Sequence, residues 1–142
     1  MKLIVISLVF LSLVACDRYQ IKLNEQQIYT PQPLFNDYKI PDMALSNCIK
    51  QLITDQSVKR AEELKSINCA YAGISDLAGL SRFTQLEVIN LANNNLTDIK
   101  TLMFFGQLRR ADISGNNALT CDDLKTLSEL LAEQLVAPNI CL

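Results

Sequence analysis

A repeat of 22 residues constrains the fold of this chain more than any other feature of its sequence. Leu64, Leu86 and Leu108 each begin a segment with apolar residues at its first, fourth and sixth positions. The first two units also share Asp76 with Asp98, Leu80 with Leu102, Phe83 with Phe105 and Gln85 with Gln107. Such regular spacing predicts that each unit forms the same local structure.

The apolar positions of each unit alternate, which predicts a short β-strand with one buried face. Alternate strand residues point to the same side. The expected inward pairs are Ile67 with Cys69, Ile89 with Leu91, and Ala111 with Ile113. Units of this length bury their apolar faces by stacking on one another. We therefore expect parallel strands over one continuous core.

This pattern resembles the leucine-rich repeat, in the short form of the bacterial internalins. The resemblance implies an α/β solenoid of about three repeats over residues 64–120, with parallel β strands and helical caps at both ends. In that family an asparagine ladder bonds the turn after each strand, and Asn94 and Asn116 stand at its place. The first repeat has Ala72 there, and Leu119 comes one residue late in the third. Terminal repeats are expected to be atypical.

The first residues have the pattern of an export signal. Lys2 precedes an apolar run over residues 3–14, which is too short to span a bilayer as a helix. The following Ala15-Cys16 completes an ending that resembles the lipobox of bacterial lipoproteins. That resemblance implies removal of a signal peptide, 1–15, and lipidation of Cys16. The alternative is an ordinary secretory signal in which Cys16 has no role.

Residues 16–39 comprise the lipidated cysteine and an expected tether, because Pro31, Pro33 and polar runs interrupt any regular pattern. The alternation of Tyr19, Ile21 and Leu23 favours a short strand as the alternative. Asp17 resembles the signal that retains enteric lipoproteins in the inner membrane. We therefore expect lipid anchoring in the bacterial cell envelope, at the periplasmic face of the inner membrane, with the outer membrane as the alternative.

Helical caps are expected at both ends of the repeats, over 40–63 and 121–142. At the first end, Asp42 is placed to cap a helix. Its apolar residues have helical spacing: Leu45, Cys48, Ile49, Leu52 and Ile53. A second short helical stretch is expected over about 56–64. At the other end one amphipathic helix is expected, with Leu124, Leu127, Leu130, Leu131 and Leu135 on its apolar face.

Four cysteines besides Cys16 are predicted to form two disulfides. The first and third strands of a stack lie about 9–10 Å apart, beyond the roughly 7 Å that a disulfide allows between Cα atoms. The expected pairs are therefore Cys48–Cys69 and Cys121–Cys141. An exported chain meets an oxidising compartment, which favours such bonds. Free thiols remain the alternative if the chain is not exported.

Several classes of function are disfavoured by composition. The chain has no histidine and no Cys-x-x-Cys pair, so we expect no metal site, no cofactor and no enzyme. Asp122 and Asp123 form an adjacent acidic pair, but acidic residues are favoured in the first turn of a helix. A net charge of −2 without a basic run argues against nucleic acid as a partner.

The outward residues of the expected strands are the candidate partner-binding surface. Leucine-rich repeats resembling this one generally bind proteins on that face. The candidates are Ser66, Asn68, Tyr71, Val88, Asn90, Arg109, Arg110 and Asp112. Tyr71, Arg109 and Arg110 are the expected anchors, because tyrosine and arginine are enriched among binding hot spots. The predicted function is an anchored protein- or peptide-binding module; the alternative is a structural accessory of an envelope assembly such as a secretion or pilus machine.

Overall fold

The computed structural model describes residues 21–23 and 26–141, which fall into two compact units divided between Pro33 and Leu34. The first contains strands β1 (Ile21–Leu23) and β2 (Gln26–Tyr29), which pair antiparallel. Residues Ile21–Leu23 therefore form a strand, which was the alternative to the expected tether. Tyr19 and the predicted export signal, with Cys16 and Asp17, lie outside the described residues.

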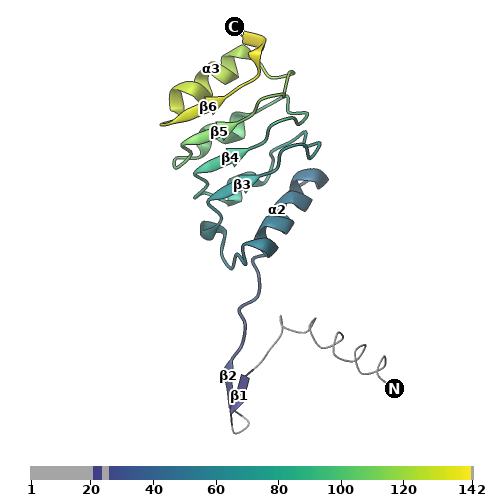
Figure 1. Ribbon diagram of the computed structural model, residues 1–142, viewed down its shortest axis with the longest axis vertical. Helices are drawn as coiled ribbons and strands as arrows, with labels where there is room; N and C mark the ends of the chain where they lie inside the picture. Colours follow the sequence, from purple (N-terminus) through teal and green to yellow (C-terminus); the bar gives the residue numbers. More distant parts are fainter. Residues whose placement is uncertain (1–20, 24–25, 142) are drawn as a thin grey trace, which may run out of the picture. The chain divides into compact units, whose positions relative to one another are not determined.

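The second unit is an α/β arrangement built on a four-stranded parallel sheet (Figure 1). Its strands are β3 (Ser66–Asn68), β4 (Val88–Asn90), β5 (Arg110–Asp112) and β6 (Gln134–Val136), paired side by side in chain order. Ser66 aligns with Val88, Val88 with Arg110, and Arg110 with Gln134. The first three strands thus have the register that the 22-residue period predicts.

The central residue of each predicted strand is buried, as its alternation requires. Ile67, Ile89 and Ala111 are 1–2 % exposed and align with one another across the sheet. The leucines that begin the units are also buried, as are both phenylalanines at position 20: Leu64, Leu86, Leu108, Phe83 and Phe105. Burial of apolar area at about 25 cal/mol per Å² makes this column the main source of stability.

Two buried asparagines connect neighbouring units and confirm the predicted asparagine ladder. Asn94 Oδ1 accepts hydrogen bonds from the backbone N–H groups of Ala72 and Ile74, at 3.1 and 3.0 Å. Its Nδ2 donates to the carbonyl oxygens of Cys69 and Leu91, at 2.9 and 2.8 Å. Each bond to Cys69, Ala72 or Ile74 joins the second unit to the first.

Asn116 makes the equivalent bonds one unit later. Its Nδ2 donates to the carbonyl oxygens of Leu91 and Ile113, at 3.0 and 2.9 Å, and its Oδ1 accepts from the N–H of Leu96. No hydrogen-bonding side-chain atom that is buried among the described residues lacks a partner. The hydrogen bonds of the ladder offset the cost of burying the two asparagines, and they satisfy backbone groups in the turns after the strands.

The chain turns through a left-handed residue after each of β3, β4 and β5, and after β3 and β4 it returns through a 3₁₀ helix. Tyr71, Asn93 and Gly115 are equivalent residues of the three units, and all have positive φ angles, of 56°, 55° and 74°. The return helices η2 (Leu80–Arg82) and η3 (Lys100–Phe104) follow. Asp76 and Asp98, matched at position 13, accept hydrogen bonds from backbone N–H groups two residues later and so begin this return.

Helix α2 (Met43–Asp55) begins where the sequence predicts, and Asp42 Oδ1 accepts a hydrogen bond from Leu45 N at 2.9 Å. The expected second helical stretch over about 56–64 is confirmed only as a short 3₁₀ helix, η1 (Ala61–Glu63). Ser57 has φ 53°, and Val58 N donates to Ile53 O. This is a Schellman ending, which turns the chain away from helical geometry.

The predicted C-terminal helix is too long. Helix α3 (Cys121–Leu130) is capped by Thr120, and the chain then becomes extended, forms β6 and ends in η4 (Asn139–Cys141). Leu135, expected on the helix face, instead aligns with Ala111 of β5. Pairing with the open edge of β5 satisfies backbone groups that would otherwise remain exposed, and this outweighs the helical spacing of the leucines. The expectation of three strands is thus corrected to four.

Part of the expected tether packs on the second unit. Phe35 stacks on Tyr38 and meets Phe83 edge to face, each at 5.9 Å between ring centroids. Phe35 N donates to Val58 O, and Arg82 contacts Asp37 through an ion pair of 3.4 Å. Residues 34–39 therefore form a strap along the second unit, and the division between the two units lies before this strap.

Candidate functional site

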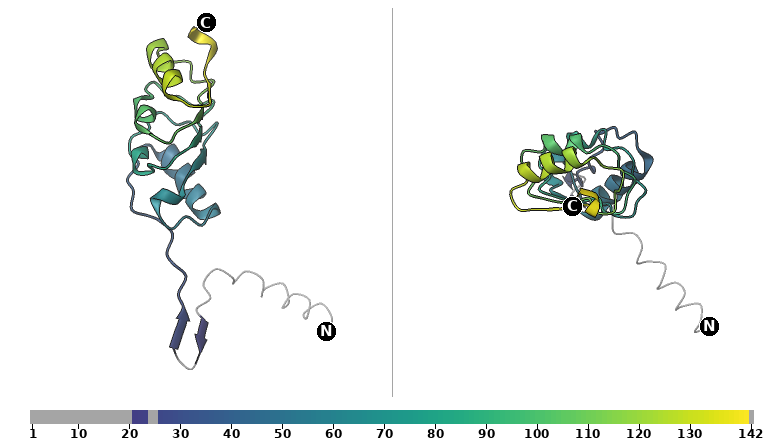
Figure 2. Two further views of the ribbon diagram at one scale, coloured as in Figure 1. Left: turned by 90° about the vertical axis from the view of Figure 1, so that its left-hand side faces the viewer. Right: turned by 90° about the horizontal axis from the view of Figure 1, so that it is seen from above.

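The candidate site is the outward face of the sheet formed by β3 to β6. The aligned residues Ser66, Val88 and Arg110 form one column, and Asn68, Asn90 and Asp112 form the next. All six are exposed or half-buried. Helix α3 and the 3₁₀ helices η2 and η3 pack together on the other side of the sheet (Figure 2). The face predicted from alternation is thus open among the described residues.

Strand β6 extends this face beyond what the sequence predicts. Gln134 continues the first column and Val136 continues the second, with 39 % of Val136 exposed. Four strands of three residues cover roughly 10 by 15–19 Å. The flat face alone is therefore smaller than the roughly 800 Å² that each partner contributes to a standard interface.

Two of the predicted binding side chains already bond the chain's own backbone. Asn90 Oδ1 accepts from Ala92 N at 3.0 Å, and Asp112 Oδ1 accepts from Ser114 N at 3.0 Å. The Ser114 hydroxyl also donates to Asp112 Oδ1, at 2.7 Å. These side chains hold the turns after β4 and β5, so substituting them would alter the loops as well as the face.

The predicted arginine anchors share a carboxylate that sequence reasoning missed. Arg109 and Arg110 lie 3.0 and 3.4 Å from the two carboxylate oxygens of Glu133. Glu133 directly precedes β6, which was predicted as helix, so its proximity to β5 could not be anticipated. An earlier pair, Lys65 with Glu87, lies at 3.1 Å. The residues that directly precede the four strands therefore alternate in charge: Lys65, Glu87, Arg109 and Glu133. This amino-terminal edge of the sheet is called its entrance.

Tyr71 lies apart from these arginines. It follows β3 at the carboxyl end of the sheet, whereas Arg109 and Arg110 lie where β5 begins. Its side chain is 80 % exposed, although its φ of 56° is rare for a bulky residue. The structure therefore does not bring the three expected anchors into one cluster.

The predicted disulfide between Cys48 and Cys69 is confirmed, with 5.9 Å between the two Cα atoms. It joins α2 to the end of β3, where Cys69 belongs to the core. Cys121 is also disulfide-bonded, and its Sγ lies 4.0 Å from the carbonyl oxygen of Ile140. The side chain of Cys141 lies outside the described part of the chain, so the Cys121–Cys141 pairing stays a prediction.

Two of the shifted pKa values belong to groups with a structural role, Asp42 and Tyr38. Burial alone would raise the pKa of Asp42, but hydrogen bonds from Leu45, Ser75 and Asp76 together lower it below its ordinary value. Burial raises the pKa of Tyr38 in the strap. Each shift is explained by packing or capping, and neither group lies on the sheet face.

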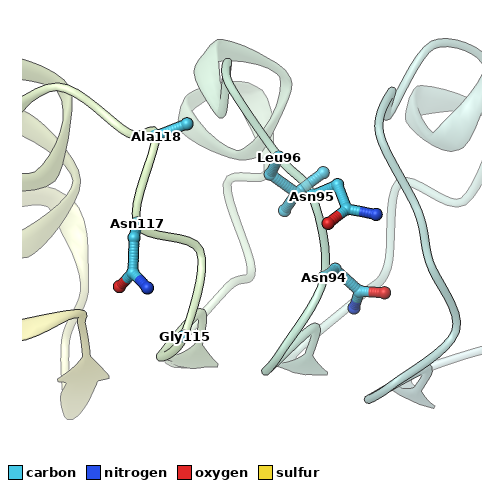
Figure 3. Close-up of a pocket in the computed structure, with 6 residues that line it drawn as sticks. All are labelled: Asn94, Asn95, Leu96, Gly115, Asn117 and Ala118. Carbon is cyan, nitrogen blue, oxygen red and sulfur yellow. The ribbon is translucent and has the colours of Figure 1, made fainter.

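The described residues contain no cluster of three or more side chains suited to hold a metal ion and no helix able to cross a membrane. A shallow depression of about 280 Å³ lies at the loops after β4 and β5 (Figure 3). Its lining residues are Asn94, Asn95, Leu96, Gly115, Asn117 and Ala118.

Comparison with known protein families and with curated proteins gave no match.

Proposed function

We propose that this chain is a lipid-anchored leucine-rich-repeat protein that binds a protein or peptide partner at the bacterial cell envelope. The open, register-aligned face of β3 to β6 carries the proposal. The domain would be a short solenoid, with α2 and the C-terminal segment as its caps.

The ladder of Asn94 and Asn116 supports the solenoid interpretation. Each asparagine bonds the turn of its own unit and the backbone of an adjacent unit. A side chain with this double role requires successive units at a constant spacing. Leu119 supports the same interpretation, because it is buried despite arriving one residue late in its unit.

The charged entrance of the sheet supports a polar partner. Exposed ion pairs contribute only about 0–1 kcal/mol to stability, so the Arg109–Glu133 and Lys65–Glu87 pairs are of little structural value. An acidic partner group could take the place of Glu133 at the two arginines. Charge pairs at an interface mainly determine specificity and the rate of association.

Anchoring is tested by substituting Cys16→Ser in the full chain. Loss of the thiol removes the atom to which the lipobox resemblance assigns the diacylglyceryl group. The variant should leave the membrane fraction or fail to be processed. Normal maturation with unchanged membrane fractionation would contradict lipidation.

Partner binding is tested with two serines that receive the same substitution. Ser66 is exposed on the sheet face, and Ser81 is exposed on η2 on the other side of the unit. Tagged full-length chains would be captured from crosslinked envelopes. Ser66→Arg should lose the partner, because a long charged side chain would stand in the face, and Ser81→Arg should retain it.

The small area of the sheet favours a second candidate function, that of a structural accessory in an envelope assembly. In that case the caps, strap or N-terminal segment make the contacts and the repeats act as a spacer. Partner capture would then survive Ser66→Arg. The same pair of variants therefore separates the two functions.

A further inference from the structure

The loops at the carboxyl end of the sheet differ in chemistry from its charged entrance. Three equivalent five-residue segments, 70–74, 92–96 and 114–118, contain no charged residue. The second and third contain five asparagines, Asn93, Asn94, Asn95, Asn116 and Asn117. This edge therefore offers amide groups without a net charge, which disfavours ionic ligands and suits a neutral ligand rich in hydroxyl groups.

Three of these five asparagines have a structural role. Asn94 and Asn116 bond the backbone inside the molecule, and Asn93 occupies the left-handed position, with its side chain lying over Gly115. A side chain on Gly115 would overlap that of Asn93. The fold therefore explains these three residues without any ligand.

Asn95 and Asn117 have no such role. Both are exposed, neither has a positive φ angle, and neither side-chain amide bonds another described residue. Each carries two donors and one acceptor oxygen. Figure 3 shows them on neighbouring loops, where they line the shallow depression.

Tyr71 adds an aromatic ring to the same edge. It stands at the position of Asn93 in the preceding unit, and its N–H donates to Ala92 O at 3.0 Å. The residue is 80 % exposed. Gly73 lies two residues later, and apart from its chain neighbours no described atom lies within 4 Å of where a side chain on Gly73 would begin. The tyrosine therefore stands beside open space, where it can stack on the apolar face of a sugar while its hydroxyl stays in water.

We infer that this edge, defined by Tyr71, Asn95 and Asn117, is a binding site for a neutral oligosaccharide chain. The depression of about 280 Å³ is open and falls below the roughly 300–1,000 Å³ of pockets that enclose a ligand. The depression suits one sugar ring of an oligosaccharide that lies across the loops. A peptide is disfavoured, because hot-spot side chains need well-packed pockets, and this edge offers none. The site is separate from the protein-binding face and does not depend on it.

The test uses amide resonances of the full chain, kept in a detergent without a sugar headgroup. Cellohexaose, chitohexaose and maltohexaose are titrated separately while side-chain NH₂ signals are followed by ¹H–¹⁵N NMR. At least one of the three should shift the signals of Asn95 and Asn117. The internally bonded amide of Asn116, which does not line the depression, serves as the matched control and should stay unchanged.

Variants distinguish a site from a general surface effect. Tyr71→Ala should weaken binding of the same hexasaccharide by roughly 2- to 10-fold, the range expected when one aromatic contact is lost. Asn95→Asp with Asn117→Asp should weaken it further, because donors become acceptors, whereas Ser66→Arg on the sheet face should leave it unchanged. Unaltered thermal unfolding would show that the variants are folded.

Two results would overturn the inference. In the first, none of the three hexasaccharides shifts the Asn95 and Asn117 signals. In the second, these signals respond to a neutral glycine-serine peptide and to no sugar, which would assign the edge to peptide backbone. Either result leaves the Ser66→Arg capture experiment, and with it the proposed function, unaffected.

Discussion

Replacing Asn94 with alanine should destabilise the chain severely, whereas the same change at Asn95 should have almost no effect. The Asn94 amide serves Ile74 N, Ala72 N and the carbonyl oxygens of Cys69 and Leu91. Leu91 O retains its bond from Asn116, and Ala72 is exposed enough to recruit water. Two buried groups, Ile74 N–H and Cys69 C=O, therefore lose this partner.

A buried polar group left without a partner costs about 1–3 kcal/mol, so the two together cost about 2–6 kcal/mol. A small domain has only about 5–15 kcal/mol in total. Asn95 is exposed and its side-chain amide bonds no described residue. The substitution Asn95→Ala should therefore change the free energy of unfolding by no more than about 0.5 kcal/mol. The two variants differ by one position in the sequence, which makes them a matched pair.

Urea unfolding of both variants, with disulfides intact, would measure the difference. Far-UV circular dichroism and tyrosine fluorescence should give coincident transitions, since the chain has four tyrosines and no tryptophan. A shift in midpoint without a change in slope would report stability alone. If Asn94→Ala costs less than about 1 kcal/mol more than Asn95→Ala, the ladder does not hold the units together and the reasoning is refuted.

Three further predictions follow from burial, protonation and the cysteines. Leu91 is fully buried, so Leu91→Ala should lower the free energy of unfolding by about 2–5 kcal/mol, as measured by thermal unfolding. Glu87→Ala, at the strand entrance, should change it by no more than about 0.5 kcal/mol. Equal effects would mean that the strand faces are reversed. Because the folded chain lowers the pKa of Asp42, its contribution to stability is complete above the ordinary pKa of 3.8 and is lost as the pH falls through the lower folded value. Asp42→Asn should remove this part of the acid dependence, and an unchanged pH profile would contradict it. Non-reducing peptide mapping should link Cys121 to Cys141, and a link from either to another cysteine would exclude that pair.

The repeat period predicted the register of the first three strands because each unit buries the same apolar positions against its neighbour. Ile67, Ile89 and Ala111 stand 22 residues apart, and stacking aligns them in one buried column. The N-cap of α2 could also be predicted from the sequence, because the hydrogen bond from Leu45 N to Asp42 is local. Local chemistry and strict periodicity thus account for the parts that were predicted.

The fourth strand could not be predicted from the same signals. The spacing of Leu127, Leu131 and Leu135 fits a helix, and no glycine or proline separates α3 from β6. The distance from β5 to β6 is 24 residues rather than 22, so the repeat alignment also misses it. Pairing with the edge of β5 is a tertiary effect, which overrides local propensity.

The same limit applies to the candidate site. The positions of Ser66, Val88 and Arg110 on one face followed from alternation alone. The ion pairs of Arg110 with Glu133 did not, because they depend on β6. The strap of Phe35 on Phe83 was missed for a related reason, since contacts between distant segments leave no periodic trace in either one.

Site-specific photo-crosslinking in intact cells tests whether the sheet face binds a partner. A photoreactive side chain would replace Asn68 on the outward face of β3 and, in a control, Ser81 on η2. If the sheet face binds a partner at the membrane, position 68 should give a discrete protein adduct in the membrane fraction and position 81 should give none. An adduct from position 81 alone, or from neither position, would contradict a partner-binding role for the sheet.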